Sequence, residues 1–240
     1  MITIFKNKLV IYGNNEEAKA IEVKKTILNN IKFNREYSNE QIKSISLKNK
    51  TIMLVIEGEE LFIKTMSIPK VSKRYVYYIL RNEITEQYGE NVMFSYEIIK
   101  EEKTCYNIIL YCFHENKYSL LKNSSIYNCN GLRINFIQNY VKDLYVKEIK
   151  EKKFILLFNY RNYIYLLKVK NNILTYNKVI NSLNFTYDEV DEAIKRFIEK
   201  NKKDYNMYSI NLSEYIQDIY NSIELSPLTM ERILQYVIIR

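Results

Sequence analysis

The segment Leu61–Lys100 constrains the fold more than any other part of the chain. It reads LFIKTMSIPK VSKRYVYYIL RNEITEQYGE NVMFSYEIIK. This order predicts a strand that ends at Ile68-Pro69, then a helix, a turn marked by Gly89, and a second strand. A helix placed between two strands indicates an α/β protein.

The helix in this segment is predicted from its apolar periodicity. Ser72 is in position to cap its first turn, and Gly89 follows its last turn, as expected for a C-terminal stop. Apolar side chains recur at spacings of three and four residues and form one stripe: Val76, Ile79, Leu80, Ile84 and Tyr88. We therefore expect an amphipathic helix that packs on a sheet.

The chain before the helix is predicted to contain short strands and one capped helix. In order, these are a hairpin over 2–12 that turns at Lys6-Asn7-Lys8, a strand over 18–23, a helix or loop over 27–31, a helix capped by Ser38 with Gln41, and a hairpin of strands 53–57 and 61–68.

The chain after the helix is predicted to repeat the same kinds of element. In order, these are paired strands over 92–99 and 106–113, a helix from 115 to about 130, a strand over 133–137, a helix over 140–149, three strands over 154–158, 163–168 and 173–180 joined by tight Asn-rich turns, a helix capped by Thr186 with Glu189, a strand over 207–212, a helix over 214–220, and a last helix from Pro227.

The net charge raises the question of a polyanionic partner. The chain has 240 residues, enough for one large domain or two small lobes, and its formal charge is +8. Acidic residues interrupt most of the lysines, however, and the abundant Lys, Asn, Ile and Tyr all have AT-rich codons. We therefore attribute the charge to genome composition and expect no nucleic acid. A basic nucleic-acid or membrane-surface binder is the less favoured alternative.

The cysteines and the histidine leave few routes to metal or nucleophilic chemistry. Cys105, Cys112 and Cys129 include no CxxC pair, so neither a disulfide framework nor a zinc cluster is expected. His114 is the only histidine, which excludes His-based metal sites and most catalytic triads. No apolar run reaches the roughly 18 residues that cross a bilayer, and no signal-peptide core is present, so we expect a cytoplasmic protein.

This order of elements resembles the PilM-type cytoplasmic proteins of type IV pilus assembly. The matching features are the Ile68-Pro69 pair, the helix that ends at Asn130-Gly131-Leu132, and the closing MERILQYVIIR, where Tyr236 replaces a family glycine. The resemblance implies an actin-like, ribonuclease-H-like α/β fold of two lobes, the second reduced. The implied domains are a first lobe (1–66 and 137–152), an inserted β-α-β-β-α subdomain (67–136) and a second lobe (153–240).

The resemblance also indicates where a nucleotide would bind. Actin-like ATPases hold phosphates in one hairpin per lobe, which requires glycine for close backbone approach and an aspartate for Mg²⁺. The corresponding positions here are Phe5, Lys6 and Asn7, and Asn159, Tyr160 and Arg161, which include neither residue type. Residues 132–240 contain no glycine at all. We therefore predict degenerate hairpins, no cofactor and no catalysis, with Arg161 in a solvated turn. An ATP-binding protein with a drifted site is the alternative.

What remains is a role in binding. PilM proteins dock the N-terminal cytoplasmic tail of PilN, a bitopic inner-membrane protein, beside the inserted subdomain. The resemblance thus implies a non-catalytic scaffold at the inner face of the cytoplasmic membrane. Its partner-binding residues are assigned to Ile68, Tyr75, Tyr78 and Tyr96, because tyrosine offers rigid amphipathic contact surface. A second alternative is the cytoplasmic domain of a GspL-like type II secretion protein, which the PilM-like closing helix disfavours.

Overall fold

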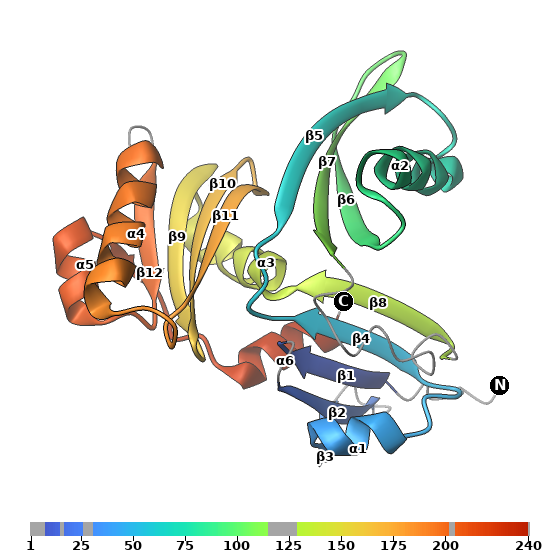
Figure 1. Cartoon of the computed structure of the whole chain (residues 1–240), viewed down its shortest axis with the longest axis horizontal. Helices are drawn as coiled ribbons and strands as arrows, with labels where there is room; N and C mark the ends of the chain where they lie inside the picture. The colour runs from blue at the N-terminus through green and yellow to red at the C-terminus, as the bar shows by residue number, and fades with distance from the viewer. Residues whose placement is uncertain (1–7, 15–16, 26–30, 115–128, 202–204, 240) are drawn as a thin grey trace.

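Three β-sheets organise the chain. The computed structural model describes residues 8–14, 17–25, 31–114, 129–201 and 205–239. Two sheets have five strands each, in the orders β3-β2-β1-β4-β8 and β11-β10-β9-β12-β13, and the third has three strands in the order β5-β7-β6. Figure 1 shows these sheets as three separate bodies around α3. Within the described residues, no helix is both long and apolar enough to cross a membrane.

The first lobe is built on the first sheet. Its antiparallel meander β1-β2-β3 is followed by α1, after which β4 pairs in parallel with β1 and β8 pairs in parallel with β4. Its elements are β1 (Lys8–Gly13), β2 (Ala18–Lys25), β3 (Ile31–Tyr37), α1 (Asn39–Ser44), β4 (Thr51–Ile56), β8 (Gly131–Phe136) and α3 (Ile137–Ile149).

The second lobe repeats the topology of the first. Its meander β9-β10-β11 is followed by α4, and then β12 pairs in parallel with β9 and β13 with β12. Its elements are β9 (Lys153–Tyr160), β10 (Tyr163–Lys170), β11 (Ile173–Asn181), α4 (Tyr187–Asn201), β12 (Asn206–Ile210), α5 (Glu214–Tyr220), β13 (Ile223–Glu224) and α6 (Met230–Ile239).

The lobes differ in what joins the fourth strand to the fifth. The second lobe uses the two-turn helix α5, whereas the first lobe places the third sheet and its helix there: β5 (Phe62–Pro69), α2 (Lys73–Tyr88), β6 (Val92–Glu101) and β7 (Cys105–His114). We call this unit the insertion. The predicted stripe is confirmed at Val76, Leu80 and Ile84, which are buried in its core. Tyr88, one turn further, is 38% exposed.

Sheet membership bears on the proposed domain boundaries. β5 begins at Phe62 and pairs with β7, so 62–66 belongs with the insertion. β8 pairs with β4, so 131–136 belongs with the first lobe. We therefore propose 62–114 as the described extent of the insertion, in place of 67–136. The helix predicted from 115 to 130 lies mostly outside the described residues.

One predicted pairing of the first lobe is wrong. Strands 53–57 and 61–68 do not form a hairpin, because β4 lies in the first sheet and β5 in the third. The helix or loop predicted over 27–31 lies outside the described residues except at Ile31, which begins the strand β3. The first described hairpin joins β1 to β2 after Gly13. Of the predicted turn Lys6-Asn7-Lys8, Lys8 begins the strand β1 and the other two residues lie outside the described residues. β1 is paired along both of its edges, with β2 on one side and β4 on the other.

The helix termini follow the predicted capping chemistry with one shift. The Ser38 amide donates to Gln41 Oε1 at 3.0 Å, and the Thr186 amide to Glu189 Oε2 at 2.8 Å, which confirms both capping boxes. The last helix begins at Met230 rather than at Pro227. Thr229 Oγ1 accepts from the Arg232 amide at 3.3 Å, so a threonine cap starts this helix.

Asparagine provides the tight turns of the second lobe. Asn171 and Asn172 join β10 to β11 with φ of 54° and 63°, the pair of left-handed residues that a two-residue hairpin turn requires. Asparagine tolerates this conformation better than other residues that have a Cβ. The prediction of Asn-rich turns is confirmed, and these turns need no glycine.

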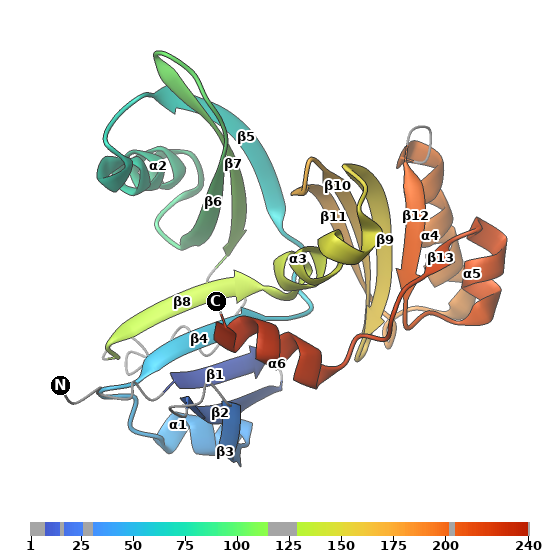
Figure 2. The same cartoon turned by 180° about the vertical axis from the view of Figure 1, so that it is seen from behind.

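Helices α3 and α6 hold the two lobes together. Tyr145 on α3 donates a hydrogen bond to the Ser226 carbonyl at 2.6 Å, and Arg232 on α6 donates to Tyr145 Oη at 3.0 Å. Lys8 on β1 donates to the Ile238 carbonyl at 3.0 Å. Figure 2 shows α6 lying against the first sheet although it follows the second. One hydrophobic core therefore continues through both lobes.

Candidate functional site at the junction of the lobes and the insertion

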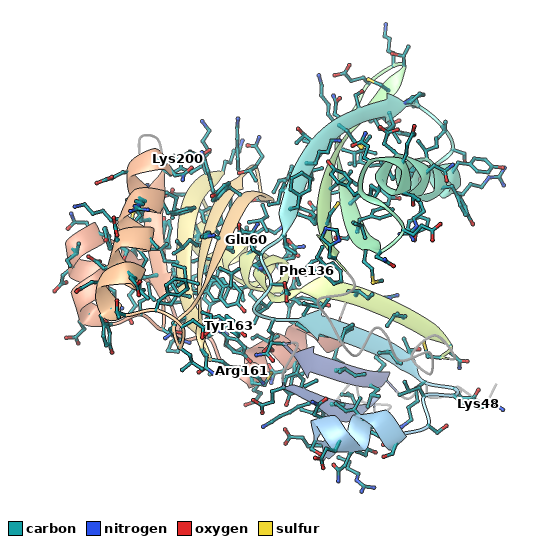
Figure 3. The ribbon with its side chains drawn as sticks, viewed as in Figure 1. Lys48, Glu60, Phe136, Arg161, Tyr163 and Lys200 are labelled. Carbon is teal, nitrogen blue, oxygen red and sulfur yellow. The ribbon has the colours of Figure 1, made fainter. Side chains whose placement is uncertain are left out.

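The five residues from Glu57 to Leu61 connect β4 to β5, and each contacts another part of the chain. We call them the junction segment. Its first residue, Glu57, lies next to the β1–β2 and β9–β10 hairpins, and its last residue, Leu61, lies next to β11. Figure 3 shows Glu60, Tyr163 and Arg161 along this boundary.

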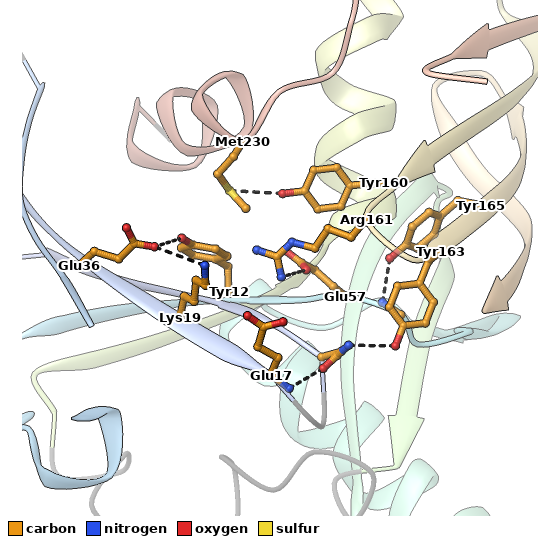
Figure 4. A network of polar contacts seen from close by, with 12 residues as sticks. Tyr12, Glu17, Lys19, Glu36, Glu57, Tyr160, Arg161, Tyr163, Tyr165 and Met230 are labelled. Carbon is orange, nitrogen blue, oxygen red and sulfur yellow. Dashed lines mark hydrogen bonds and ion pairs between the residues drawn. The ribbon is translucent and has the colours of Figure 1, made fainter. Parts of the chain in front are cut away.

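Glu57 forms the buried end of an ion pair between the lobes. Its side chain is 2% exposed, and its carboxylate lies 2.9 Å from the guanidinium of Arg161 (Figure 4). Its amide donates to the Gly13 carbonyl at 2.9 Å, which fixes it beside the β1–β2 hairpin. Burial raises the pKa of Glu57 to about 7, against the opposing effect of Arg161. Desolvation of the carboxylate therefore outweighs its pairing.

Arg161 lies between two tyrosines rather than in a solvated turn. It has φ of 55° in the two-residue turn between β9 and β10, and its side chain is 28% exposed. Its Cζ is 5.3 Å from the ring centre of Tyr12 and 5.7 Å from that of Tyr160. These are cation–π distances, so the guanidinium is enclosed by both lobes. Burial also raises the pKa of both tyrosines far above the usual value.

Gly58 is required at its position by a close aromatic contact. Its φ is +75°, and a Cβ there would lie 2.5 Å from the ring of Tyr163. Its amide donates to Tyr165 Oη at 2.8 Å. Tyr163 Oη in turn accepts from Asn14 Nδ2 at 2.9 Å, so the hairpins of the two lobes are hydrogen-bonded directly.

Asn177 on β11 binds the other end of the junction segment. Its Oδ1 accepts from the Leu61 amide at 2.9 Å, and its Nδ2 donates to the Leu61 carbonyl at 2.8 Å. The side-chain amide thus pairs with the main chain as a neighbouring strand would. Gln138 Nε2 donates to the Glu59 carbonyl at 2.6 Å, and Lys178 lies 2.9 Å from Glu60.

The predicted site residues fall into two places. Asn159, Tyr160 and Arg161 belong to the β9–β10 hairpin, as predicted, and the last two lie at the junction. Phe5, Lys6 and Asn7 lie outside the described residues.

The residues assigned to partner binding lie on the insertion but differ in exposure. Tyr75 and Tyr78 are 49% and 65% exposed on α2, and Tyr96 is half-buried on β6. Ile68 is buried in the core of the insertion, so its side chain packs inside this core rather than lying on the surface. Tyr77, which sequence reasoning did not assign, stacks on Phe94 with ring centres 5.2 Å apart.

Sequence reasoning missed the junction segment and Asn177. The segment EGEEL has the composition of a solvated turn, and the periodicity of β4 gives no sign that its next residue is buried. One usable signal was Asn177 itself, a polar residue at a position that would otherwise be buried in the β11 pattern. A buried amide requires partners, which indicates a main-chain contact.

The fold resembles those of several solved structures. A Bacteroides thetaiotaomicron protein with an actin-like ATPase fold and unknown function matches all of this chain and 99% of its own, with a TM-score of 0.55 and 12% identity. The PilM–PilN type IV pilus biogenesis complex matches 95% of this chain and 89% of that one, with a TM-score of 0.57 and 9% identity.

The cytoplasmic domain of EpsL, an inner-membrane component of the Vibrio cholerae type II secretion system, matches 98% of this chain and 96% of its own, with a TM-score of 0.54 and 9% identity. No family model matches the sequence. No curated protein matches it either. The chain is therefore an actin-like α/β protein, as the sequence predicted. At these identities the likeness defines the fold alone.

The fold raises the question of a nucleotide, and the described residues at the junction do not fit one. The Asn14–Tyr163 hydrogen bond joins the two hairpins directly, and the Arg161–Glu57 pair joins the second hairpin to the end of β4. Arg161 is thus already paired with Glu57, and Glu17 places a second carboxylate nearby. Among the described residues, no cluster of three or more His, Cys, Asp or Glu side chains could hold a metal ion.

Proposed function

We propose that this protein is a non-catalytic scaffold of a type IV pilus or related secretion complex. In this proposal it binds the N-terminal cytoplasmic tail of a PilN-like bitopic membrane protein and is thereby held at the inner face of the membrane. The structural likeness to the PilM–PilN complex supports this class of role. The direct contacts between the lobes, Glu57–Arg161 and Asn14–Tyr163, support the absence of nucleotide hydrolysis.

The observation that carries the proposal is a surface of aromatic side chains on the insertion. We call it the aromatic face and define it as Tyr75, Tyr77, Tyr78 and Phe94. Tyr75, Tyr77 and Tyr78 are between 48% and 65% exposed. Tyr77 and Tyr78 meet edge to face with ring centres 6.0 Å apart, so the rings are already ordered. Ordered aromatic rings lose little entropy on binding and are common anchors in interfaces.

A neighbouring strand edge supplies the polar half of a peptide site. In the described part of the chain, β6 pairs with β7 alone and forms one edge of the third sheet. Such an edge has free main-chain donors and acceptors that an extended peptide can pair with. Phe94 lies on β6, so the aromatic face and the free edge are adjacent.

The test uses a PilN-like bitopic membrane protein of the same organism. A fluorescent peptide of its cytoplasmic N-terminal tail is titrated with the full chain, and we expect saturable anisotropy. Tyr78→Ala and Phe94→Ala should each weaken binding at least about fivefold, the loss of one aromatic anchor. Tyr176→Ala, at an exposed tyrosine on β11 of the second lobe, is the matched control. Equal affinity of all four proteins would contradict the proposed face.

A calorimetric titration tests the non-catalytic part. Mg-ATP is added to the full chain, and we expect no saturable heat. Micromolar binding would support the drifted ATPase instead.

A second candidate is the cytoplasmic domain of a type II secretion inner-membrane protein. It is favoured by the likeness to EpsL, whose coverage is mutual and nearly complete. The same titration discriminates between the two, with the tail of the type II secretion partner as the competing peptide.

A further inference from the structure

A cavity of about 760 Å³ opens in the second lobe, away from the insertion. It lies where the β9–β10 hairpin, the loop before α4 and the start of α5 meet. Buried apolar side chains line it from the lobe core, namely Ile164, Val190 and Leu212. The volume is enough for one or two large side chains of a ligand.

The loop between β11 and α4 adds large apolar groups at the mouth. Phe185 and Tyr187 line the cavity and are 49% and 95% exposed. Leu183, two residues earlier, is 71% exposed. Three large apolar side chains within five exposed residues are a feature of interaction sites rather than of ordinary surface.

The polar groups of the cavity are mostly acceptors. Asp188 and Asp191 are in its lining, which includes no lysine or arginine among the described residues. Asp191 Oδ1 accepts one hydrogen bond, from Tyr220 at 2.9 Å. Asn159 also belongs to the lining, and its Oδ1 is buried with no hydrogen-bond partner among the described residues. A buried acceptor without a donor is costly, so the cavity favours a ligand that brings donors.

We propose that this cavity binds a short segment of a partner polypeptide that has a bulky apolar side chain next to a lysine or arginine. The apolar side chain fills the space over Val190, and the cation meets the two aspartates. Main-chain or side-chain N–H groups of the segment supply the donor that Asn159 lacks. The cavity is acidic although the chain as a whole has a formal charge of +8, so a cationic side chain would be attracted to this part of the surface. The site is on the other lobe from the aromatic face and does not rest on the proposed function.

The test compares two dipeptides on the ¹⁵N-labelled full chain. N-acetyl-Phe-Arg-amide is titrated to millimolar concentration, followed by N-acetyl-Phe-Glu-amide. We expect saturable NMR shifts for the Asn159 side-chain amide and the Ser182 and Ser213 main-chain amides with the first peptide. The second peptide should bind at least fivefold more weakly.

A charge reversal on α4 provides the matched pair of variants. Asp188→Lys should weaken Phe-Arg binding at least fivefold, whereas Glu199→Lys, the same change at the far end of this helix, should leave it unchanged. Both positions are exposed, so both variants should fold. Equal binding of the two dipeptides, shifts that follow protein concentration rather than peptide, or displacement of the peptide by ATP would each overturn the proposal.

Discussion

The guanidinium of Arg161 lies 2.9 Å from the carboxylate of Glu57, and this pair joins the β9–β10 hairpin of the second lobe to the end of β4 in the first. Both groups are removed from most of the solvent, but unequally, since Glu57 is 2% exposed and Arg161 28%. Burial of the Glu57 carboxylate therefore costs desolvation free energy, and the strength of the ion pair depends on whether Glu57 is protonated.

The first prediction concerns pH. Because the pKa of Glu57 is raised from 4.5 to about 7, the native state holds a proton between these values that the unfolded state has lost. The contribution of Glu57 to stability is therefore complete below about pH 4.5 and is lost as pH rises through 7, by about 3 kcal/mol. Urea unfolding from pH 4.5 to 8 should show this loss relative to Glu57→Gln. Parallel curves for the two proteins would refute it, and Glu90→Gln, an exposed carboxylate, is the control.

The second prediction concerns the cation. Arg161→Met leaves the Glu57 carboxylate buried without its partner, so we expect a loss of roughly 3 kcal/mol in the free energy of unfolding at pH 8. The loss should shrink at pH 5, where Glu57 is protonated. The double variant with Glu57→Gln should recover much of the stability at pH 8, and a double-mutant cycle measures the coupling. Additive effects would mean that the two residues do not interact in solution.

The third prediction concerns Asn177. Asn177→Leu leaves the buried amide and carbonyl of Leu61 without partners, which should cost at least about 2 kcal/mol. Hydrogen exchange of the Leu61 amide should become faster. Asn177→Asp retains the acceptor for that amide but puts a buried carboxylate oxygen against the Leu61 carbonyl, so it is also destabilised. Its Leu61 amide should nevertheless exchange more slowly than that of Asn177→Leu. If both variants exchange at the wild-type rate, the contact does not hold the junction segment.

The fourth prediction separates steric contact from backbone strain. Gly58 and Gly89 both have positive φ, but a Cβ meets the Tyr163 ring at Gly58 and nothing within 4 Å at Gly89. Gly89→Ala should cost about 1–3 kcal/mol, the strain of a residue with a Cβ at positive φ and a ψ of 174°. Gly58→Ala should cost clearly more, since Tyr163 must also move. If both variants lost the same free energy of unfolding in thermal denaturation, the Tyr163 ring would not contact Gly58.

The fifth prediction concerns the core of the insertion. Leu80 is fully buried between Val76 and Ile84, and Leu80→Ala should cost about 2–5 kcal/mol. Tyr75→Ala, on the exposed side of the same helix, should change the free energy of unfolding by less than about 0.5 kcal/mol. A small effect of Leu80→Ala would mean that α2 does not pack on the third sheet.

The repeated strands and helices could be predicted because their signals are local. Apolar segments separated by turn signals identified β6, β7 and the second meander, and the capping boxes at Ser38 and Thr186 marked two helix starts. The pairing of β4 could not be read in this way. Its fully apolar run fits a hairpin with β5 as well as a buried parallel strand, and only the partner strand β1 decides between them.

The junction was beyond sequence reasoning for a similar reason. The burial of Glu57 depends on Arg161, more than one hundred positions away, and no spacing rule connects the two. Arg161 illustrates the point, because an arginine in a two-residue turn is usually solvated, whereas here the first lobe covers it.

The Asn177–Leu61 hydrogen bonds attach the insertion to the second lobe as well as to the first. The insertion is covalently part of the first lobe, yet its point of attachment is hydrogen-bonded to β11 of the second. If the lobes rotated by a few degrees relative to each other, the insertion would therefore not move rigidly with the first sheet. The aromatic face would turn about Leu61, so a change in the angle between the lobes would also change the position of any peptide bound to that face.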